Sequence, residues 1–181
     1  FEPAVLAAPN AFETEGKLKL WARHSASDGG ILENTISYPA GEIPQRTLVL
    51  IKPDNFRFPT GRPGNVIDFF SRTALYIVGI KVLRMSVAEA MEFYGPVREV
   101  LRTKLSGVVG SKAKAVLEKE LEFKLPPACE KQLGELLVGP YGDNQFDNIV
   151  KFMAGRRPAE CDETNRAQPG TEKCIALVYE G

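Results

Sequence analysis

The sequence predicts a mixed fold of helices and strands. Runs rich in Leu, Val and Ile are typical of strands and occur at 46–51, 76–83 and 174–179. Between them, apolar residues recur at helical spacing at 65–72, 86–94 and through most of 96–140. The residues themselves therefore predict the order strand, helix, strand, helix.

The first strand prediction also points to a functional residue. The apolar run ends at Pro53, which has no backbone N–H to give to a sheet, so we expect a buried, central strand that ends at Lys52. A phosphate-binding cation would lie at such a strand end. Asp54 is more simply expected to order the turn behind Pro53. Arg57 and Arg62 either line a phosphate entrance or are solvated, since they lack the spacing of a P-loop.

The later helices have clear sequence signals. Ser86 and Glu89 form a capping-box pattern that predicts a helix running to about 93–94. Most of 96–140 has helical character and is expected to form an inserted helical subdomain. Residues 146–153 predict another short helix that ends at Gly155, followed by a polar loop from 156 to 173.

Composition limits the class of protein. With 181 residues, 44% of them hydrophobic and 25% charged, the chain can bury a core as one domain with an extension or as parts of two. Its 23 basic and 23 acidic side chains balance, so the net charge gives no reason to expect binding to nucleic acid or to a membrane surface. No apolar run approaches the roughly 20 residues of a membrane span.

The cysteines and the chain ends support two further expectations. Cys129, Cys161 and Cys174 are odd in number and lack CxxC spacing, so neither a disulfide framework nor a zinc site is expected, and a reducing cytoplasm fits best. The chain begins at Phe1 and stops at Gly181, directly behind a predicted strand. We therefore expect it to be a piece of a longer polypeptide.

Three blocks, in order, resemble the nucleoside diphosphate kinase family. They are the strand before Lys52-Pro53-Asp54; the run 76–84 with a helix ending at Tyr94; and 149–155 leading to 176–181. The similarity covers 46–95 and 146–181. Segments 96–145 and 156–173 look like insertions relative to short family members.

The resemblance implies a fold and a reaction. The fold would be a ferredoxin-like α+β sandwich, an antiparallel sheet with helices on one face, here with an inserted helical subdomain. The reaction would transfer the γ-phosphate of a nucleoside triphosphate to a nucleoside diphosphate through a phosphohistidine, with Mg²⁺ accompanying ATP. No metal ligand is expected from the chain itself. A cytoplasmic homo-oligomer is implied, with nucleoside di- and triphosphates as partners and no membrane or nucleic acid.

The resemblance also assigns residues. Lys52 matches the lysine that contacts the transferred phosphate, and Tyr94 matches the tyrosine beside it. Phe146 or its neighbour would stack on the base. In the family the arginines, asparagine and nucleophilic histidine follow the strand that ends here at 180–181, so this chain alone is predicted to be inactive.

The N-terminal segment resembles the tail of a preceding kinase-like domain. An apolar strand is predicted at 3–8 and a helix over 13–23 with Asn10 as N-cap, and Ala7 and Ala8 stand where the histidine would be. We therefore divide the chain into a strand-helix segment with linker at 1–45 and a kinase-like domain at 46–181. His24 is expected to be solvent-exposed or capping rather than catalytic.

Two rival functions remain open. A catalytically inactive kinase-like module would serve nucleotide binding or assembly, with the helical insertion as its interaction surface. An unrelated ferredoxin-like RNA-binding domain would need exposed strand aromatics and a basic sheet face, and neither is evident.

Overall fold

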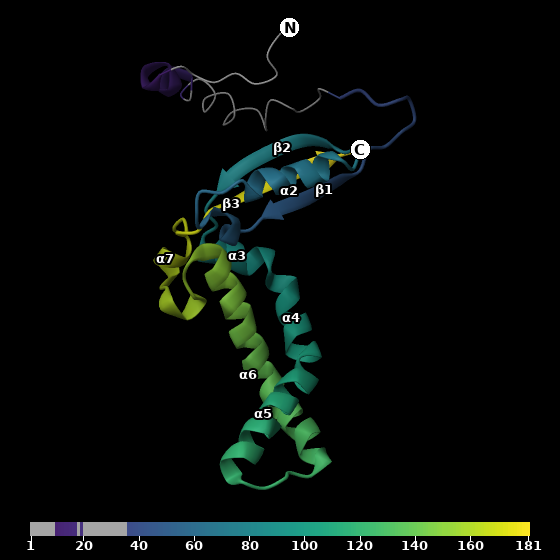
Figure 1. Ribbon diagram of the computed structural model, residues 1–181, viewed down its shortest axis with the longest axis vertical. Helices are drawn as coiled ribbons and strands as arrows, with labels where there is room; N and C mark the ends of the chain where they lie inside the picture. Colours follow the sequence, from purple (N-terminus) through teal and green to yellow (C-terminus); the bar gives the residue numbers. More distant parts are fainter. Residues whose placement is uncertain (1–9, 18, 20–35) are drawn as a thin grey trace. The chain divides into compact units, whose positions relative to one another are not determined.

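A computed structural model describes residues 10–17, 19 and 36–181 (Figure 1). They divide into two compact units. A sheet unit holds the described part of residues 1–51, Phe58–Val82 and Ile175–Gly181, and a helical unit holds Lys52–Arg57 and Leu83–Cys174. Strands and helices are both present, as predicted for an α+β protein. The sequence-based boundary at residue 45 remains a prediction.

The sheet has the strand order β1-β3-β2 among the described residues. These strands are β1 (Arg46–Ile51), β2 (Tyr76–Leu83) and β3 (Cys174–Glu180), close to their predicted ranges. β1 pairs with β3 in antiparallel register, from Arg46 opposite Glu180 to Ile51 opposite Ile175. The Arg46 guanidinium donates to the Glu180 carboxylate at 2.5 Å across this register.

The prediction of a buried first strand was wrong, and β1 is not central among the described strands. β1 lies at one edge of the described sheet, and burial is confined to its end, with Leu48 49% exposed and Ile51 2% exposed. β3 is central and holds the fully buried Leu177 and Tyr179. The physical reason is that an apolar run specifies a strand but does not specify on how many sides the strand is paired or covered.

One helix covers the Tyr179 side of the sheet. α2 (Arg62–Ser71) brings the Phe70 ring to 5.7 Å from the Tyr179 ring, centroid to centroid. Figure 1 shows α2 lying along the strands. The predicted helix at 65–72 is therefore present and begins one turn earlier.

The helical unit begins with a well-capped helix. α3 (Val87–Phe93) has the predicted capping box, in which Glu89 N–H donates to Ser86 Oγ at 3.1 Å and Ser86 N–H donates to Glu89 Oε2 at 2.8 Å. These bonds satisfy backbone donors that have no partner within the helix. Val87 and Ala90 are fully buried, which fixes the face that α3 turns inward.

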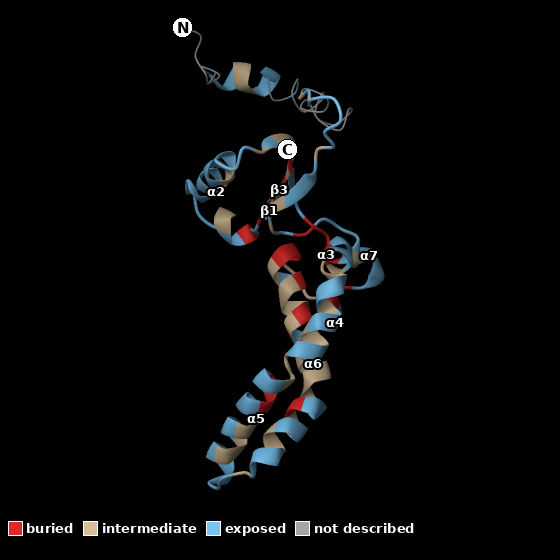
Figure 2. Ribbon diagram, turned by 90° about the vertical axis from the view of Figure 1, so that its right-hand side faces the viewer, coloured by how far each residue is buried: buried red, intermediate tan, exposed pale blue. Residues whose placement is uncertain are grey.

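Three further helices pack together in the same unit. They are α4 (Gly95–Lys104), α5 (Ser106–Leu121) and α6 (Pro127–Ala154). α6 contacts both α4 and α5. Figure 2 shows buried residues in the C-terminal part of α6, whereas α5 is mostly exposed.

Glycines permit the close approach of α5 to α6. A Cβ on Gly134 would lie 2.5 Å from the Ser106 carbonyl oxygen, and a Cβ on Gly110 would overlap the Glu130 carbonyl oxygen. Real Cβ atoms do not approach backbone atoms so closely, so any side chain at these positions would push the helices apart.

The predicted short helix at 146–153 is the end of the 28-residue α6. Pro140 does not end this helix, although it removes one internal hydrogen bond. Both Pro140 and Leu136, whose carbonyl loses its partner, are exposed, and water can satisfy that carbonyl. Gly155 ends α6 in the left-handed conformation, with φ 85°, as predicted.

The segment from 156 to 173 is not a plain loop. It contains a 3-10 helix, η2 (Pro158–Glu160), and a short helix, α7 (Glu163–Arg166), capped by the Asp162 side chain. Thr171 N–H donates to the Ala154 carbonyl at 3.1 Å, which ties the end of this segment back to α6.

The N-terminal predictions are only partly covered. Residues 11–17 are helical, and Glu13 N–H donates to Asn10 Oδ1 at 2.9 Å, which confirms Asn10 as an N-cap. The predicted strand at 3–8, with Ala7 and Ala8, and the residue His24 lie outside the described residues. None of the described helices has both the length and the apolar character that a membrane span requires.

The glycine packing predicts opposite effects for two substitutions on α5. Gly110→Ala should lower the free energy of unfolding by about 1–3 kcal/mol, because the new methyl meets the α6 backbone. Gly107→Ala, where a Cβ meets nothing within 4 Å, should leave it unchanged or raise it by up to about 1 kcal/mol. Urea unfolding measures both. Equal midpoints for the two variants would contradict this account of the packing.

Candidate functional site

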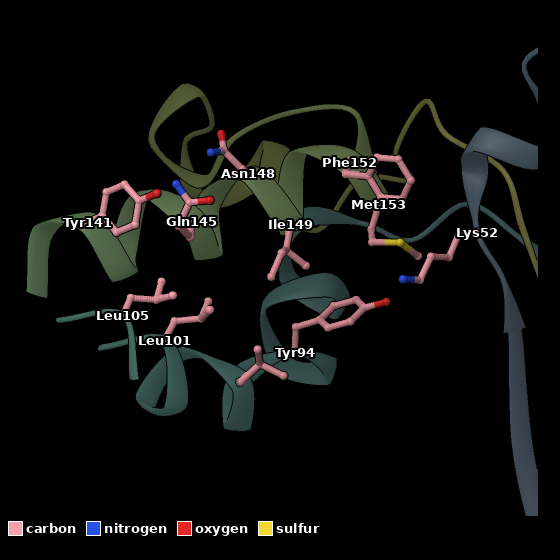
Figure 3. A pocket seen from close by; sticks show the side chains of 11 residues that line it. Lys52, Tyr94, Leu101, Leu105, Tyr141, Gln145, Asn148, Ile149, Phe152 and Met153 are labelled. Carbon is pink, nitrogen blue, oxygen red and sulfur yellow. The ribbon is translucent and has the colours of Figure 1, made fainter. Parts of the chain in front are cut away.

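A pocket of about 430 Å³ lies within the helical unit (Figure 3). Its volume falls in the range of small-molecule sites. Its lining comes from Lys52, from the end of α3, and from facing sides of α4 and α6. The lining residues are Lys52, Tyr94, Val97, Leu101, Leu105, Tyr141, Gln145, Asn148, Ile149, Phe152 and Met153.

Lys52 is held by the turn that follows it. Pro53 is fully buried at the start of the 3-10 helix η1 (Pro53–Phe56), and the Lys52 carbonyl accepts from both the backbone and the side-chain N–H of Asn55, each at 3.1 Å. Asp54 Oδ1 accepts from the same Asn55 amide at 3.3 Å, in keeping with an ordering role. The backbone is thus anchored while the lysine side chain is exposed.

Tyr94 stands at the C-terminal end of α3. Its backbone N–H donates to the Ala90 carbonyl at 3.1 Å, and its ring meets the Phe93 ring edge-on at 4.9 Å. Burial raises the pKa of the Tyr94 hydroxyl, and the Cys174 thiol adds to this increase. The hydroxyl therefore stays protonated at neutral pH and can donate a hydrogen bond. Figure 3 shows Lys52 and Tyr94 at the same end of the pocket, beside Met153.

An ion-pair cluster joins the two helices that form the pocket walls. Asp143 on α6 accepts from Arg98 Nε at 2.9 Å and from Arg102 Nε and Nη2 at 2.8 Å each. Hydrogen bonds from Arg102 and then Arg98 lower the pKa of Asp143 to about 2. Next to this cluster, a Cβ on Gly142 would lie 2.9 Å from the Arg102 backbone, so α4 and α6 also approach closely.

Phe146 is placed differently from the other two predicted site residues. Its ring is 2% exposed and lies under the Arg98 guanidinium, whose carbon is 5.4 Å from the ring centroid. The structure thus brings Lys52 and Tyr94 to one pocket and leaves Phe146 outside its lining. The aromatic residues of α6 that do line it are Tyr141 and Phe152.

The sequence reasoning did not identify the α4 and α6 walls as part of the site. On α6 the lining residues recur at intervals of three or four, from Tyr141 through Gln145, Asn148 and Phe152, so they share one helix face. That spacing was available in the sequence. It was missed because the helix was expected to end near 140, which put Tyr141 and Gln145 on a different element from Phe152.

Arg57 and Arg62, both considered as a phosphate entrance, are not among the residues that line this pocket. Arg57 stands over the Phe152 ring at 5.9 Å and borders a second depression of about 300 Å³, with Lys151 and Glu172. Arg62 is the first residue of α2 in the sheet unit. Neither residue lines the pocket at Lys52.

The cysteines and the acidic residues provide no metal centre in the described part of the chain. Cys129, Cys161 and Cys174 are all free thiols. No group of three or more His, Cys, Asp or Glu side chains among the described residues is arranged to hold an ion. The pocket lining likewise contains no carboxylate.

The pocket therefore has two chemically distinct parts. One end offers a cation from Lys52 and a hydrogen-bond donor from Tyr94, and the rest combines aliphatic side chains with two aromatic rings and two amides. A ligand that matches both parts has an anionic group joined to a body that is partly apolar and partly able to form hydrogen bonds.

One stretch of the chain is similar in sequence to a curated protein. No family model matches the chain. A curated nucleoside diphosphate kinase from Staphylothermus marinus is 48% identical over 50 residues, which are 28% of this chain and 34% of that protein. The chain thus spans about a third of the length of the curated relative it matches. A solved NDP kinase structure from Pyrobaculum aerophilum has a TM-score of 0.45 and 22% identity, over 77% of this chain and 61% of that one.

The Asp143 cluster predicts a specific dependence of stability on pH. Because the folded-state pKa of Asp143, about 2, is below its ordinary value of 3.8, its stabilisation is complete above about pH 4 and is lost as the pH falls toward about 2. The difference in unfolding free energy between the wild type and Asp143→Asn should therefore shrink over this interval. Urea titrations at several pH values measure it.

Asp147→Asn, also on α6, is the matched control, since the structure gives Asp147 no ion pair among the described residues. At neutral pH it should change the free energy of unfolding less than Asp143→Asn does, because it breaks no ion pair. A difference between Asp143→Asn and the wild type that does not vary with pH would contradict the cluster's role.

Proposed function

We propose that the chain is a relative of the nucleoside diphosphate kinases and that its helical unit binds nucleoside di- and triphosphates in the pocket at Lys52 and Tyr94. One observation carries the proposal. Lys52 and Tyr94, which the family resemblance assigns to phosphate binding, lie 42 residues apart in the chain yet line one pocket of nucleotide size.

The pocket chemistry supports a nucleotide. The Lys52 ammonium would attract the phosphates as a point charge, and the protonated Tyr94 hydroxyl would donate to a phosphate oxygen. The aliphatic walls on α4 and α6 would bury the faces of sugar and base. By excluding water, these walls would strengthen the interaction between Lys52 and the phosphates.

For the whole protein we propose transfer of the γ-phosphate between nucleotides through a phosphohistidine. The contribution of this chain would be positioning and charge stabilisation, on which phosphoryl transfer largely depends. None of the described residues that line the pocket is a histidine, and His24, the sequence's one histidine, lies outside the described residues. The nucleophile would therefore have to come from a histidine outside this pocket lining, and the chain by itself would bind nucleotide without turnover.

Magnesium has no carboxylate ligand in the pocket lining. The described residues of the lining would therefore not hold a magnesium ion by themselves. That Mg²⁺ accompanies the nucleotide remains a prediction of the family resemblance.

A ferredoxin-like sandwich is likewise proposed for the sheet unit. In support, β1 and β3 are antiparallel, β3 is central, and α2 packs on the Tyr179 side. The outer edge of β1 has no partner strand among the described residues and could accept a fourth strand. A homo-oligomer and a cytoplasmic location also remain predictions of the resemblance.

The alternative is a catalytically inactive module that binds nucleotide or serves in assembly. Lys52 and Tyr94 suit this function as well, since binding a nucleotide requires only the cation and the hydrogen-bond donor that line the pocket. The two functions differ in one product, because only the kinase forms an acid-labile phosphohistidine when the intact protein meets ATP.

Removal of the Lys52 charge tests the binding proposal. Lys52→Met should weaken ATP binding by about 10- to 100-fold, because a charge-assisted contact is worth about 1.5–3 kcal/mol. Titration calorimetry measures the dissociation constant. Lys104→Met, an exposed α4 lysine outside the lining, is the matched control and should bind as the wild type does. Equal affinities for the two variants, or no ATP binding by the wild type, would overturn the proposal.

A further inference from the structure

Three polar side chains follow one face of α6 along the pocket. Tyr141, Gln145 and Asn148 are spaced by four and three residues, so they lie on the same side of the helix, and all three belong to the pocket lining. Figure 3 shows them in order along α6, with Leu101 of α4 and Leu105, which directly follows α4, opposite. We call these three residues the polar stripe.

Two members of the polar stripe already have partners. Asn148 Oδ1 accepts from Arg157 Nη2 at 2.5 Å. The Tyr141 hydroxyl accepts from Lys112 Nζ at 3.2 Å, and that nitrogen is also 5.7 Å from the Tyr141 ring centroid. These contacts fix both side chains from outside the pocket.

Gln145 differs from its two neighbours in the stripe. It is half-buried, and its amide makes no hydrogen bond within the part of the chain that the structure describes. Aliphatic residues, Leu101 and Leu105 among them, line the pocket around it. A primary amide has one acceptor oxygen and two N–H donors, so Gln145 offers both kinds of partner to a ligand.

The position of Gln145 relative to Lys52 suits an elongated ligand. Gln145 precedes Met153 by eight residues on α6, which is about 12 Å along the helix axis. Met153 is at the Lys52 end of the pocket (Figure 3). Ile149 lies between them in the lining. A matching ligand therefore has an anionic end, an apolar middle and a far edge that forms hydrogen bonds.

We propose that Gln145 recognises the hydrogen-bonding edge of the base of a nucleotide bound in this pocket. The inference rests on the proposed nucleotide-binding function and assigns the part of the pocket that selects the base. With adenine, Gln145 Oε1 would accept from the 6-amino group while Nε2 donates to an adjacent ring nitrogen, the paired contact that glutamine commonly makes with this base.

The same geometry predicts tolerance of other bases. Rotation of the amide by 180° exchanges donor and acceptor, so one glutamine can match bases that present either pattern at their edge. Any base with a hydrogen-bonding edge would thus bind more tightly beside Gln145 than an analogue without one. The apolar surroundings increase this difference in affinity, because water cannot easily replace the missing contact.

A paired change in protein and ligand tests the proposal. The ligands are ATP and purine riboside triphosphate, which lacks only the 6-amino group. The wild type should bind ATP about tenfold more tightly than this analogue. Gln145→Met keeps the length of the side chain and removes the amide, so it should bind both ligands with similar affinity. The ratio of the two dissociation constants, measured by calorimetry, isolates the contact from any general change in the pocket.

Two further variants complete the experiment. Gln132→Met, an exposed glutamine on α6 outside the lining, should keep the tenfold ratio. Gln145→Leu provides a second apolar replacement if the methionine variant fails to fold. An unchanged ratio in a folded Gln145 variant, or equal binding of the two ligands by the wild type, would overturn the role of Gln145 and leave nucleotide binding intact. No binding of either ligand by the wild type would overturn both.

Discussion

The carboxylate of Asp143 holds α4 against α6 by accepting hydrogen bonds from Arg98 and Arg102. These helices provide most of the pocket lining, so the width of the pocket depends on this contact. The three side chains are each about a third exposed or more, and exposed ion pairs contribute little individually to stability. Both arginines bond to the one carboxylate, and the cluster lies beside the close approach of the helices at Gly142. Its main effect is therefore to fix the position of α4 against α6 rather than to add stability.

Helix α6 contributes both to the packing of the helical unit and to the candidate site. α6 presents buried residues such as Phe146 and Val150 to the interior of the helical unit and presents the Tyr141 to Phe152 face to the pocket. Phe146 under Arg98 belongs to the packing and Gln145 beside it belongs to the pocket, because adjacent helical residues point in different directions. Binding and stability are therefore coupled through one element, and substitutions on α6 must be interpreted with that in mind.

Local signals in the sequence predicted much of the fold. The capping box at Ser86, the aliphatic runs of β1, β2 and β3 and the glycine stop at Gly155 each act over a few residues, and each was confirmed. The length of α6 was not predicted, since a proline ordinarily ends a helix. Pro140 is tolerated because its side of the helix is exposed.

The site could be predicted only in part, because local signals in the sequence do not show how the helices pack. A family resemblance pointed to Lys52 and Tyr94, and the fold brings them to one pocket. The residues from α4 and the polar stripe of α6 join them through packing between helices, which no local pattern reveals. Leu101 and Leu105 look like ordinary core residues in the sequence, and their role as a pocket wall depends on where α6 stands.

The central claim is that this pocket, rather than another part of the chain, receives the nucleotide. Amide hydrogen exchange with and without magnesium ATP tests it directly, because a bound ligand slows the opening of the elements that it contacts. The account predicts slower exchange in residues 94–105, which comprise α4 and its two flanking residues, and in residues 141–153 of α6. Protection confined to α2 and the strands, or no change in any segment at saturating ATP, would contradict it.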